Sequence, residues 1–173
     1  MPERLTITNL AALDRDTFVD TLGAVFEHSP WVVERAWQKR PFASRAALLA
    51  VLGEVLSEAG RERQLSLINA HPELAGKLAA GGALTADSAR EQAGAGLAAC
   101  SPEEFISIQR HNAAYLGKFG WPFIVAVKGL SRQQIIAEMR RRIERAPDEE
   151  FAEALAQILR IADFRLGDLL AGE

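Results

Sequence analysis

The sequence predicts an all-α protein, and its composition and its periodicity are the observations that predict it. Alanine and leucine are the commonest residues, whereas aromatic residues make up only 7% of the chain. Apolar residues recur mostly with the 3.6-residue period of an α-helix and not with the alternation of a strand. The 173 residues contain no repeat or linker, and a chain of this length fits one domain of about 100–200 residues. We therefore expect a single compact domain over residues 1–173, with about eight helices.

Helical segments are predicted along the N-terminal part of the chain, and their ends carry recognisable signals. The first runs from about Asp14 to Glu27, and Pro30 ends it. Ser44 is suited to cap the third segment, because its side chain can accept a hydrogen bond from the backbone of the first helical turn. Gly60 ends that helix. The predicted segments cover approximately residues 14–27, 31–37, 44–59 and 61–70.

Pro72 marks a junction between two predicted helices. Because the residue before a proline is disfavoured in the helical conformation, His71 is expected at a corner. Pro72 itself suits the first position of the next helix, which Gly81-Gly82 ends. A further helix, capped by Thr85 or Asp87, covers the residues up to 92.

Two capping boxes predict where the next two helices begin. Ser101 is followed by a proline at the first helical position and by Glu104 at the third. Gly117 can end this helix in the left-handed conformation. Ser131 and Gln134 form the second capping box. The last predicted helix covers residues 149–170.

The segment of residues 119–129 does not follow a helical pattern. Trp121 to Val127 form an apolar run that fits either a buried strand or an extended segment lining a cavity. Periodicity does not separate these two alternatives. We favour extended backbone that lines a pocket.

Charge and composition argue against several classes of function. The formal net charge is −3, so the chain lacks the basic character typical of nucleic-acid-binding domains. Its longest apolar run is far shorter than the ~20 residues that span a bilayer, and no membrane association is expected. The lone Cys100 and the lack of a signal segment predict a cytoplasmic location. The three histidines lack metal-ligand spacing, so we expect no metal site.

Arg165 lies on the stripe of the last helix that is expected to be buried. It follows Ile158 by seven residues and Ala162 by three. Burying an unpaired guanidinium is strongly unfavourable. Arg165 must therefore meet a carboxylate of the protein or face a pocket for a polar or anionic ligand.

Two further polar features can carry chemistry. His71, at its corner, can exchange protons near neutral pH, or it can be a hydrogen-bonded structural residue. Ser88, Glu91 and Gln92 share one helix face through their i, i+3 and i+4 spacing. Such a face can bind the edge of a urea or amide group, which offers both N–H and C=O, or it can simply be solvated.

These features fall within motifs whose order and combination are specific. The motifs are Glu27-His28-Ser29-Pro30-Trp31-Val32, Arg40-Pro41-Phe42, Asn69-Ala70-His71-Pro72-Glu73-Leu74-Ala75, Ser88-Ala89-Arg90-Glu91-Gln92, Tyr115-Leu116-Gly117-Lys118-Phe119-Gly120-Trp121-Pro122-Phe123-Ile124 and Arg165-Leu166. Together they resemble the 2-oxo-4-hydroxy-4-carboxy-5-ureidoimidazoline (OHCU) decarboxylases of urate breakdown. The resemblance spans nearly the whole chain.

The resemblance implies an all-helical, cofactor-free enzyme, usually a homodimer, that converts this small-molecule substrate to (S)-allantoin with release of CO2. His71 matches the catalytic histidine of the family, and we expect it to act with Glu91 as an acid/base pair. Arg165 matches the family's buried arginine, and we expect the three side chains to meet at one small pocket. The substrate-binding residues implied are Pro72, Ser88, Ala89, Arg90, Gln92, Phe123, Ile124, Val125, Ala126, Val127 and Arg165.

One alternative belongs to a different class of function. A helical ligand-binding or regulatory domain could keep the same pocket without its catalysis. The presence of both His71 and Glu91 argues against this alternative.

Overall fold

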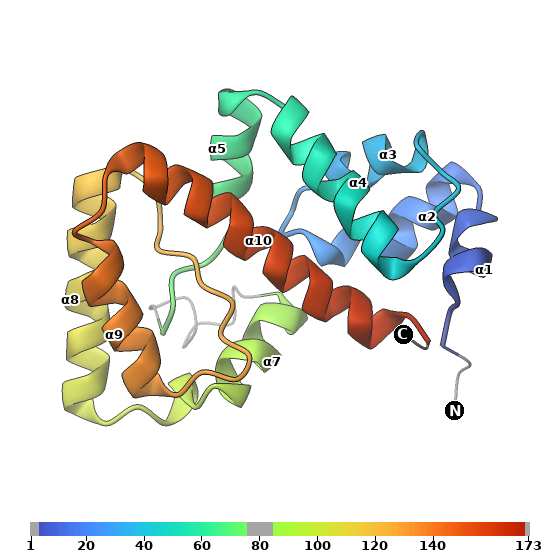
Figure 1. Ribbon diagram of the computed structural model, residues 1–173. Helices are drawn as coiled ribbons and strands as arrows, with labels where there is room; N and C mark the ends of the chain where they lie inside the picture. The colour runs from blue at the N-terminus through green and yellow to red at the C-terminus, as the bar shows by residue number, and fades with distance from the viewer. Residues whose placement is uncertain (1–3, 76–84, 172–173) are drawn as a thin grey trace. The chain divides into compact units, whose positions relative to one another are not determined.

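The computed structural model describes residues 4–75 and 85–171 of the chain. Within these ranges the regular elements are α-helices and two short 3₁₀ helices (Figure 1). Leu5 and Leu170 form an isolated β-bridge outside these helices. The prediction of an all-α fold is confirmed. The α-helices are α1 (Ile7–Ala11), α2 (Arg15–Leu22), α3 (Trp31–Trp37), α4 (Arg45–Glu58), α5 (Arg61–Asn69), α7 (Ala86–Gly94), α8 (Pro102–Phe119), α9 (Arg132–Arg142) and α10 (Pro147–Leu169), and the 3₁₀ helices are Gly23–Val25 and Leu97–Ala99.

The chain divides into two compact units. The first contains the chain up to Ala70 and again from Ile158 onward, and the second contains His71–Gln157. Helix α10 contributes its first residues to the second unit and its remaining residues to the first. The polar residues that the sequence singles out divide in the same way, because His71 and α7 belong to the second unit whereas Arg165 belongs to the first.

Helices α2, α3 and α4 pack together in the first unit. Leu48 and Leu52 on α4 are completely buried, as their helical spacing predicts. Ser44 caps α4, and its side chain accepts a hydrogen bond from the backbone N–H of Ala47 at 3.0 Å. The predicted segments that became α3, α4 and α5 are therefore confirmed within one or two residues at each end.

The first predicted helix is shorter than expected. Helix α2 ends at Leu22 and a 3₁₀ turn follows at Gly23–Val25, whereas the sequence predicted a helix up to Glu27. The carbonyl of Ala24 accepts a hydrogen bond from Arg165 Nη1 at 3.1 Å. This tertiary contact, together with the poor helix propensity of Gly23, explains the early end.

Both capping boxes predicted in the second unit are confirmed. Ser101 Oγ accepts a hydrogen bond from the N–H of Glu104 at 3.2 Å, and the Glu104 side chain accepts from the N–H of Ser101 at 3.0 Å. Ser131 and Gln134 make the same reciprocal pair at the start of α9. Helices α8 and α9 pack against each other (Figure 1).

The predicted end of α8 at Gly117 is wrong. Gly117 stays inside the helix, and Gly120 ends it with a left-handed φ of +85°. The additional turn places the Phe119 ring against Tyr115, with ring centroids 4.5 Å apart. Aromatic burial of this kind extends the helix past the earlier glycine.

Pro72 does not begin a helix within the described residues, and that prediction is also wrong. The chain turns at Leu74 and Ala75, and Ala75 has a left-handed φ of +48°. The left-handed φ of Ala75 is incompatible with an α-helix that runs on from Pro72, and side chains of α8 hold this turn by donating to the carbonyls of Leu74 and Ala75. The predicted helix end at Gly81-Gly82 lies outside the described residues.

The segment Trp121–Val127 contains neither helix nor strand and runs as a stretched coil between α8 and α9 (Figure 1). All seven residues are buried. This confirms non-helical backbone at the apolar run. No helix among the described residues is long and apolar enough to cross a bilayer.

Candidate active site

His71 lies in a buried turn that directly follows α5 and Ala70. His71 is only 8% exposed. The turn continues to Ala75, whose left-handed φ costs about 1–2 kcal/mol in a residue with a Cβ atom. Surrounding contacts must therefore hold the turn in this conformation.

Three side chains of the second unit supply those contacts. Gln92 Oε1, from α7, accepts a hydrogen bond from the backbone N–H of Ala75 at 3.1 Å. On α8, Gln109 Nε2 donates to the carbonyl of Ala75, and Asn112 Nδ2 donates to the carbonyl of Leu74 at 2.9 Å. The turn that carries His71 is thus attached to both α7 and α8.

Helix α7 brings the predicted polar face together. Thr85 caps the helix by accepting from the N–H of Ser88 at 3.2 Å. Ser88 and Gln92 are buried, and Glu91 is half-buried beside them. Gln92 Oε1 already accepts from the N–H of Ala75, and the donor that Gln92 can offer a ligand is its Nε2 amino group.

Two other predicted residues of α7 lie on its exposed side. Ala89 and Arg90 are both exposed. The Arg90 guanidinium lies 2.7 Å from Asp87 on the same helix. The buried face of α7 is therefore formed by Ser88 and Gln92.

The predicted pocket-lining residues Phe123–Val127 are held by side chains at two backbone positions. Arg142 Nη1, at the end of α9, donates to the carbonyl of Ile124 at 2.5 Å. Gln157 Oε1, on α10, accepts from the N–H of Ala126 at 2.9 Å. The peptide groups on both sides of Val125 are therefore held, one by the buried Arg142 and the other by the half-buried Gln157.

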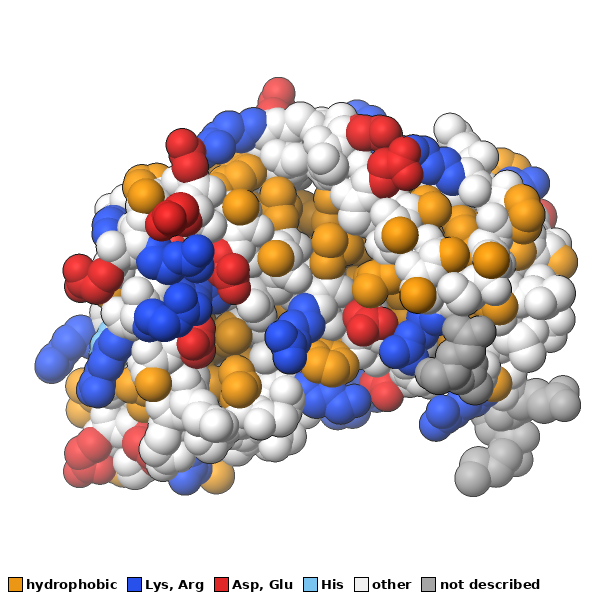
Figure 2. Space-filling model, in the orientation of Figure 1, with side chains coloured by type: hydrophobic (Ala, Val, Ile, Leu, Met, Phe, Trp, Pro, Cys, Tyr) orange, Lys and Arg blue, Asp and Glu red, His pale blue; other side chains and the backbone are white. Residues whose placement is uncertain are grey.

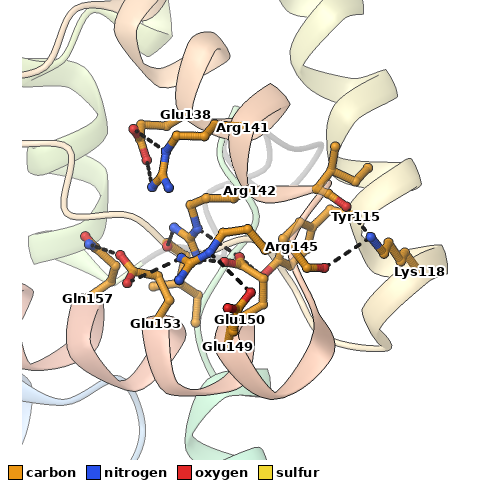
Figure 3. Close-up of polar contacts among 12 residues, drawn as sticks. Tyr115, Lys118, Glu138, Arg141, Arg142, Arg145, Glu149, Glu150, Glu153 and Gln157 are labelled. Atoms are coloured by element: carbon orange, nitrogen blue, oxygen red, sulfur yellow. Dashed lines mark hydrogen bonds and ion pairs between the residues drawn. The ribbon is translucent and has the colours of Figure 1, made fainter.

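A largely buried ionic cluster, which we call the Arg142 network, contacts this segment through the Arg142 guanidinium and was not predicted from the sequence (Figure 3). It consists of Tyr115, Arg142, Arg145 and Glu150. Glu150 Oε1 lies 2.9 Å from Arg142 Nε and 2.7 Å from the Tyr115 hydroxyl, and Glu150 Oε2 lies 3.1 Å from Arg145 Nη1. The side chains of Arg142 and Glu150 are completely buried. Burial and the hydrogen bond to Glu150 raise the pKa of Tyr115 well above its ordinary value, so the hydroxyl stays a donor.

A signal for this network was present in the sequence. Arg142 follows Ile135 by seven residues and Met139 by three, which is the same spacing that singles out Arg165. The run Arg140-Arg141-Arg142 also suits the C-terminal end of a helix, where basic side chains interact favourably with the helix dipole. Figure 2 shows Lys and Arg side chains lying beside Asp and Glu side chains over this part of the second unit.

Arg165 is buried in the first unit and pairs with a carboxylate. Its Nη2 lies 2.8 Å from Glu27 Oε1, and its Nη1 donates to the carbonyls of Ala24 and Val25 at 3.1 and 3.4 Å. The first of the two alternatives drawn from the sequence, pairing with a protein carboxylate, is therefore confirmed. In the described ranges, no group of three or more His, Cys, Asp or Glu side chains is arranged to hold a metal ion.

Comparison with known proteins gives a consistent answer. The sequence profile of the OHCU decarboxylase family matches residues 11–167. The 2-oxo-4-hydroxy-4-carboxy-5-ureidoimidazoline decarboxylase of Haloferax volcanii is 39% identical over 169 residues, which cover 98% of each chain. The uric acid degradation bifunctional protein PucL of Bacillus subtilis is 41% identical over 165 residues, and the match covers 95% of this chain but 33% of that protein.

A solved structure shares the fold. The crystal structure of (S)-allantoin synthase superposes with a TM-score of 0.77 at 24% identity, and the match covers 96% of this chain and 54% of that chain. The family profile spans most of the sequence, and the Haloferax relative matches along almost its full length. The chain belongs to the OHCU decarboxylase family.

Proposed function

We propose that this chain is a carboxy-lyase that decarboxylates OHCU to (S)-allantoin and CO2 during the breakdown of urate. The observation that carries the proposal is the 39% identity, over 98% of both chains, to a protein named for this reaction. The buried turn of His71 and the polar face of α7 support it, because the Ala75–Gln92 hydrogen bond joins the elements that carry His71 and Glu91.

The substrate supplies its own electron acceptor. When the bond between ring carbon C4 and the carboxylate breaks, CO2 leaves and the electron pair forms a C4=C5 double bond, while the former C=N nitrogen takes up a proton. A second proton is then added to C5 as the C4 hydroxyl loses its proton and becomes the carbonyl of allantoin. One proton is consumed overall. Since no external electron acceptor is needed, we propose that the reaction requires no cofactor.

We propose that His71 and Glu91 move these protons. An imidazole and a carboxylate can exchange protons with the hydroxyl, the ring nitrogen and C5, and a positioned acid or base typically contributes about 10²–10⁴-fold to the rate. Protonation of C5 from one side gives one enantiomer, provided that bulk water is excluded. The buried environment of His71 supports such a requirement.

Gln92 and Val125 are proposed as binding groups. Gln92 offers its Nε2 amino group, a donor suited to a ring or ureido carbonyl. A planar trans peptide points its C=O and N–H in opposite directions. Because Arg142 binds the carbonyl of Ile124 and Gln157 binds the N–H of Ala126, the N–H and C=O of Val125 point away from these side chains. A donor and an acceptor on one residue suit the ureido group, which has both.

The remaining assignments rest on the family resemblance. Arg165 is proposed to bind substrate oxygens that gain negative charge during the reaction. The positive charge of Arg165 is balanced by the Glu27 carboxylate. We also propose a cytoplasmic homodimer. The other residues proposed to line the substrate pocket are Pro72, Ser88, Ala89, Arg90, Phe123, Ile124, Ala126 and Val127.

The test uses freshly generated OHCU and follows its absorbance and the circular dichroism of the product. We expect the wild-type protein to accelerate loss of the substrate and to give optically active allantoin. His71→Ala and Glu91→Ala should lose about 10²-fold or more of the activity. His111→Ala and Glu103→Ala are matched controls, because His111 bonds within its own helix and Glu103 is exposed.

A wild-type protein that leaves the spontaneous decay unchanged and the product racemic would overturn the proposed function. Equal losses in the His111→Ala and His71→Ala variants would remove His71 from the mechanism.

A further inference from the structure

The completely buried Arg142 directs its side chain at the backbone of a neighbouring segment. Its Nη1 donates to the carbonyl of Ile124, and its guanidinium carbon lies 4.4 Å from the centre of the Phe123 ring. Its Nε is bound to Glu150 at the same time. The guanidinium is therefore held on two edges, so the position of the Ile124 carbonyl is fixed by a rigid planar group.

Gln157 holds the next peptide unit from α10. Its Oε1 accepts from the N–H of Ala126, and its Nε2 donates to Glu153 at 2.9 Å. Glu153 in turn lies 3.6 Å from Arg145, which also pairs with Glu150 (Figure 3). Arg142 and Gln157 thus belong to one connected set of polar side chains.

The two contacts fall on consecutive peptide units. The Ile124 carbonyl belongs to the peptide that contains the N–H of Val125, and the Ala126 N–H belongs to the peptide that contains the carbonyl of Val125. Fixing one atom of each planar unit also fixes the direction of its other polar atom. Arg142 and Gln157 therefore set the orientation of the N–H and C=O of Val125 by binding the other polar atom of each peptide unit.

A buried ion pair is a poor device for stability alone. Removing two charges from water costs several kcal/mol for each ion, and well-packed apolar residues of similar volume often serve as well or better. An apolar replacement could not bind the Ile124 carbonyl, which would then be buried without a partner. Orientation of this carbonyl is a role that requires a hydrogen-bond donor, which Arg142 supplies.

We infer that Arg142 and Gln157 are positioning residues for the reaction, which act by orienting the peptide groups of Val125 toward the substrate. This inference rests on the proposed function, in which Val125 binds the ureido group. Neither residue needs to touch the substrate. Glu150 and Tyr115 support Arg142 from the side away from the segment.

The test compares each positioning residue with a neighbour that shares its partners but not its contact with the segment. Arg142→Lys keeps the charge but cannot bind Glu150 and Ile124 with one planar group. Arg145→Lys is its control, because Arg145 also pairs with Glu150. Gln157→Met removes the acceptor for Ala126 at similar volume, and Glu153→Gln is its control because it still accepts from Gln157.

We expect Arg142→Lys and Gln157→Met each to lower kcat/KM by about tenfold to a hundredfold, since a misplacement of about 1 Å can cost as much as a hundredfold. The optical purity of the allantoin should fall as well. Both controls should keep the wild-type values. The kinetics are measured well below the midpoint temperature of thermal unfolding of each variant. A merely structural role lowers that temperature without changing the kinetics of the folded enzyme.

The inference also has a readout that does not depend on turnover. In protein with isotope-labelled valine amides, the Val125 amide resonance should shift in both positioning variants and stay in place in both controls. If one positioning variant fails to fold, the other still decides, because each holds a different peptide unit. Unchanged kcat/KM, optical purity and Val125 resonance in a folded Arg142→Lys or Gln157→Met protein would overturn the inference. An inactive wild-type protein would instead contradict the proposed function.

Discussion

Arg165 and Glu27, 138 positions apart in the chain, form a buried ion pair with 2.8 Å between Nη2 and Oε1. Their side chains are only 3% and 1% exposed. Each charge is tolerated in the interior because the other is present, and the carbonyls of Ala24 and Val25 accept further hydrogen bonds from the guanidinium. The pair therefore ties the C-terminal helix to the turn after α2.

Removing one partner of this pair should destabilise the protein severely. We expect Glu27→Gln to lower the free energy of unfolding by about 3–5 kcal/mol, because Arg165 stays charged and buried after its ion pair with Glu27 is lost. Urea denaturation measures the change. Glu34→Gln is the control: Glu34 pairs with Arg15 at the surface, at 3.4 Å, and its loss should cost about 1 kcal/mol or less. Similar values for the two variants would show that the buried pair is unimportant.

Two substitutions of Gln92 should separate its structural role from its proposed binding role. Gln92→Glu keeps an acceptor for the Ala75 N–H but places a carboxyl group at a buried position, so the hydrogen bond should persist while stability falls as the pH rises and the carboxyl ionises. It loses the amino group proposed to bind a substrate carbonyl, and we expect KM to rise about tenfold, the worth of about one hydrogen bond.

Gln92→Leu removes the acceptor as well, and should lower the free energy of unfolding by about 1–3 kcal/mol. Denaturation and steady-state kinetics of both variants make the comparison. Equal KM values in Gln92→Glu and wild type would exclude the amino group from substrate binding.

The two glycines near the end of α8 should respond in opposite directions to alanine. Gly120 has a φ of +85°, so Gly120→Ala should cost about 1–2 kcal/mol. Gly117 lies within the helix with open space around the position of a Cβ atom, so Gly117→Ala should stabilise by about 0.5–1 kcal/mol. Thermal unfolding of the two variants provides the measurement. The same sign for both would contradict the observed helix end.

Tyr115 is the single tyrosine of the chain, so its ionisation can be followed directly by ultraviolet absorbance. Burial, and then the hydrogen bond to Glu150, raise the pKa of Tyr115 above its ordinary value of 10.0. A group whose pKa is raised by folding contributes stability below its unfolded pKa, and that contribution is lost as the pH rises above it. We expect no tyrosinate signal in the native protein as the pH passes the ordinary value, and its appearance together with unfolding.

Tyr115→Phe is the matched variant for this titration. It should lose about 0.5–1.5 kcal/mol at neutral pH through the missing hydrogen bond to Glu150, and its stability should decline less steeply in alkali. Ionisation of Tyr115 near its ordinary pKa in folded protein would contradict the buried environment.

The candidate site was predictable only in part. The spacing of Ser88 and Gln92 predicted a shared face, and the structure buries both of them. The hydrogen bond between Ala75 and Gln92 was not predictable, because it joins a turn to a helix across seventeen positions with no local signal. Arg142 was missed although its spacing matched that of Arg165, because it ends a run of three arginines that also suits the dipole at the C-terminal end of a helix.

The sequence by itself determined the helical class and most of the helix starts, because these depend on local interactions. The capping boxes at Ser101 and Ser131 are hydrogen bonds between residues three positions apart, so their formation does not depend on how the rest of the chain folds.

Tertiary structure alone decided the local conformation where a backbone carbonyl accepts a hydrogen bond from a side chain far along the chain. Arg165 donates to the Ala24 carbonyl where α2 ends early, and side chains of α8 donate to the carbonyls of Leu74 and Ala75 and hold the turn after Pro72. A buried carbonyl must have a hydrogen-bond partner, and when that partner lies far along the chain, local sequence cannot identify it.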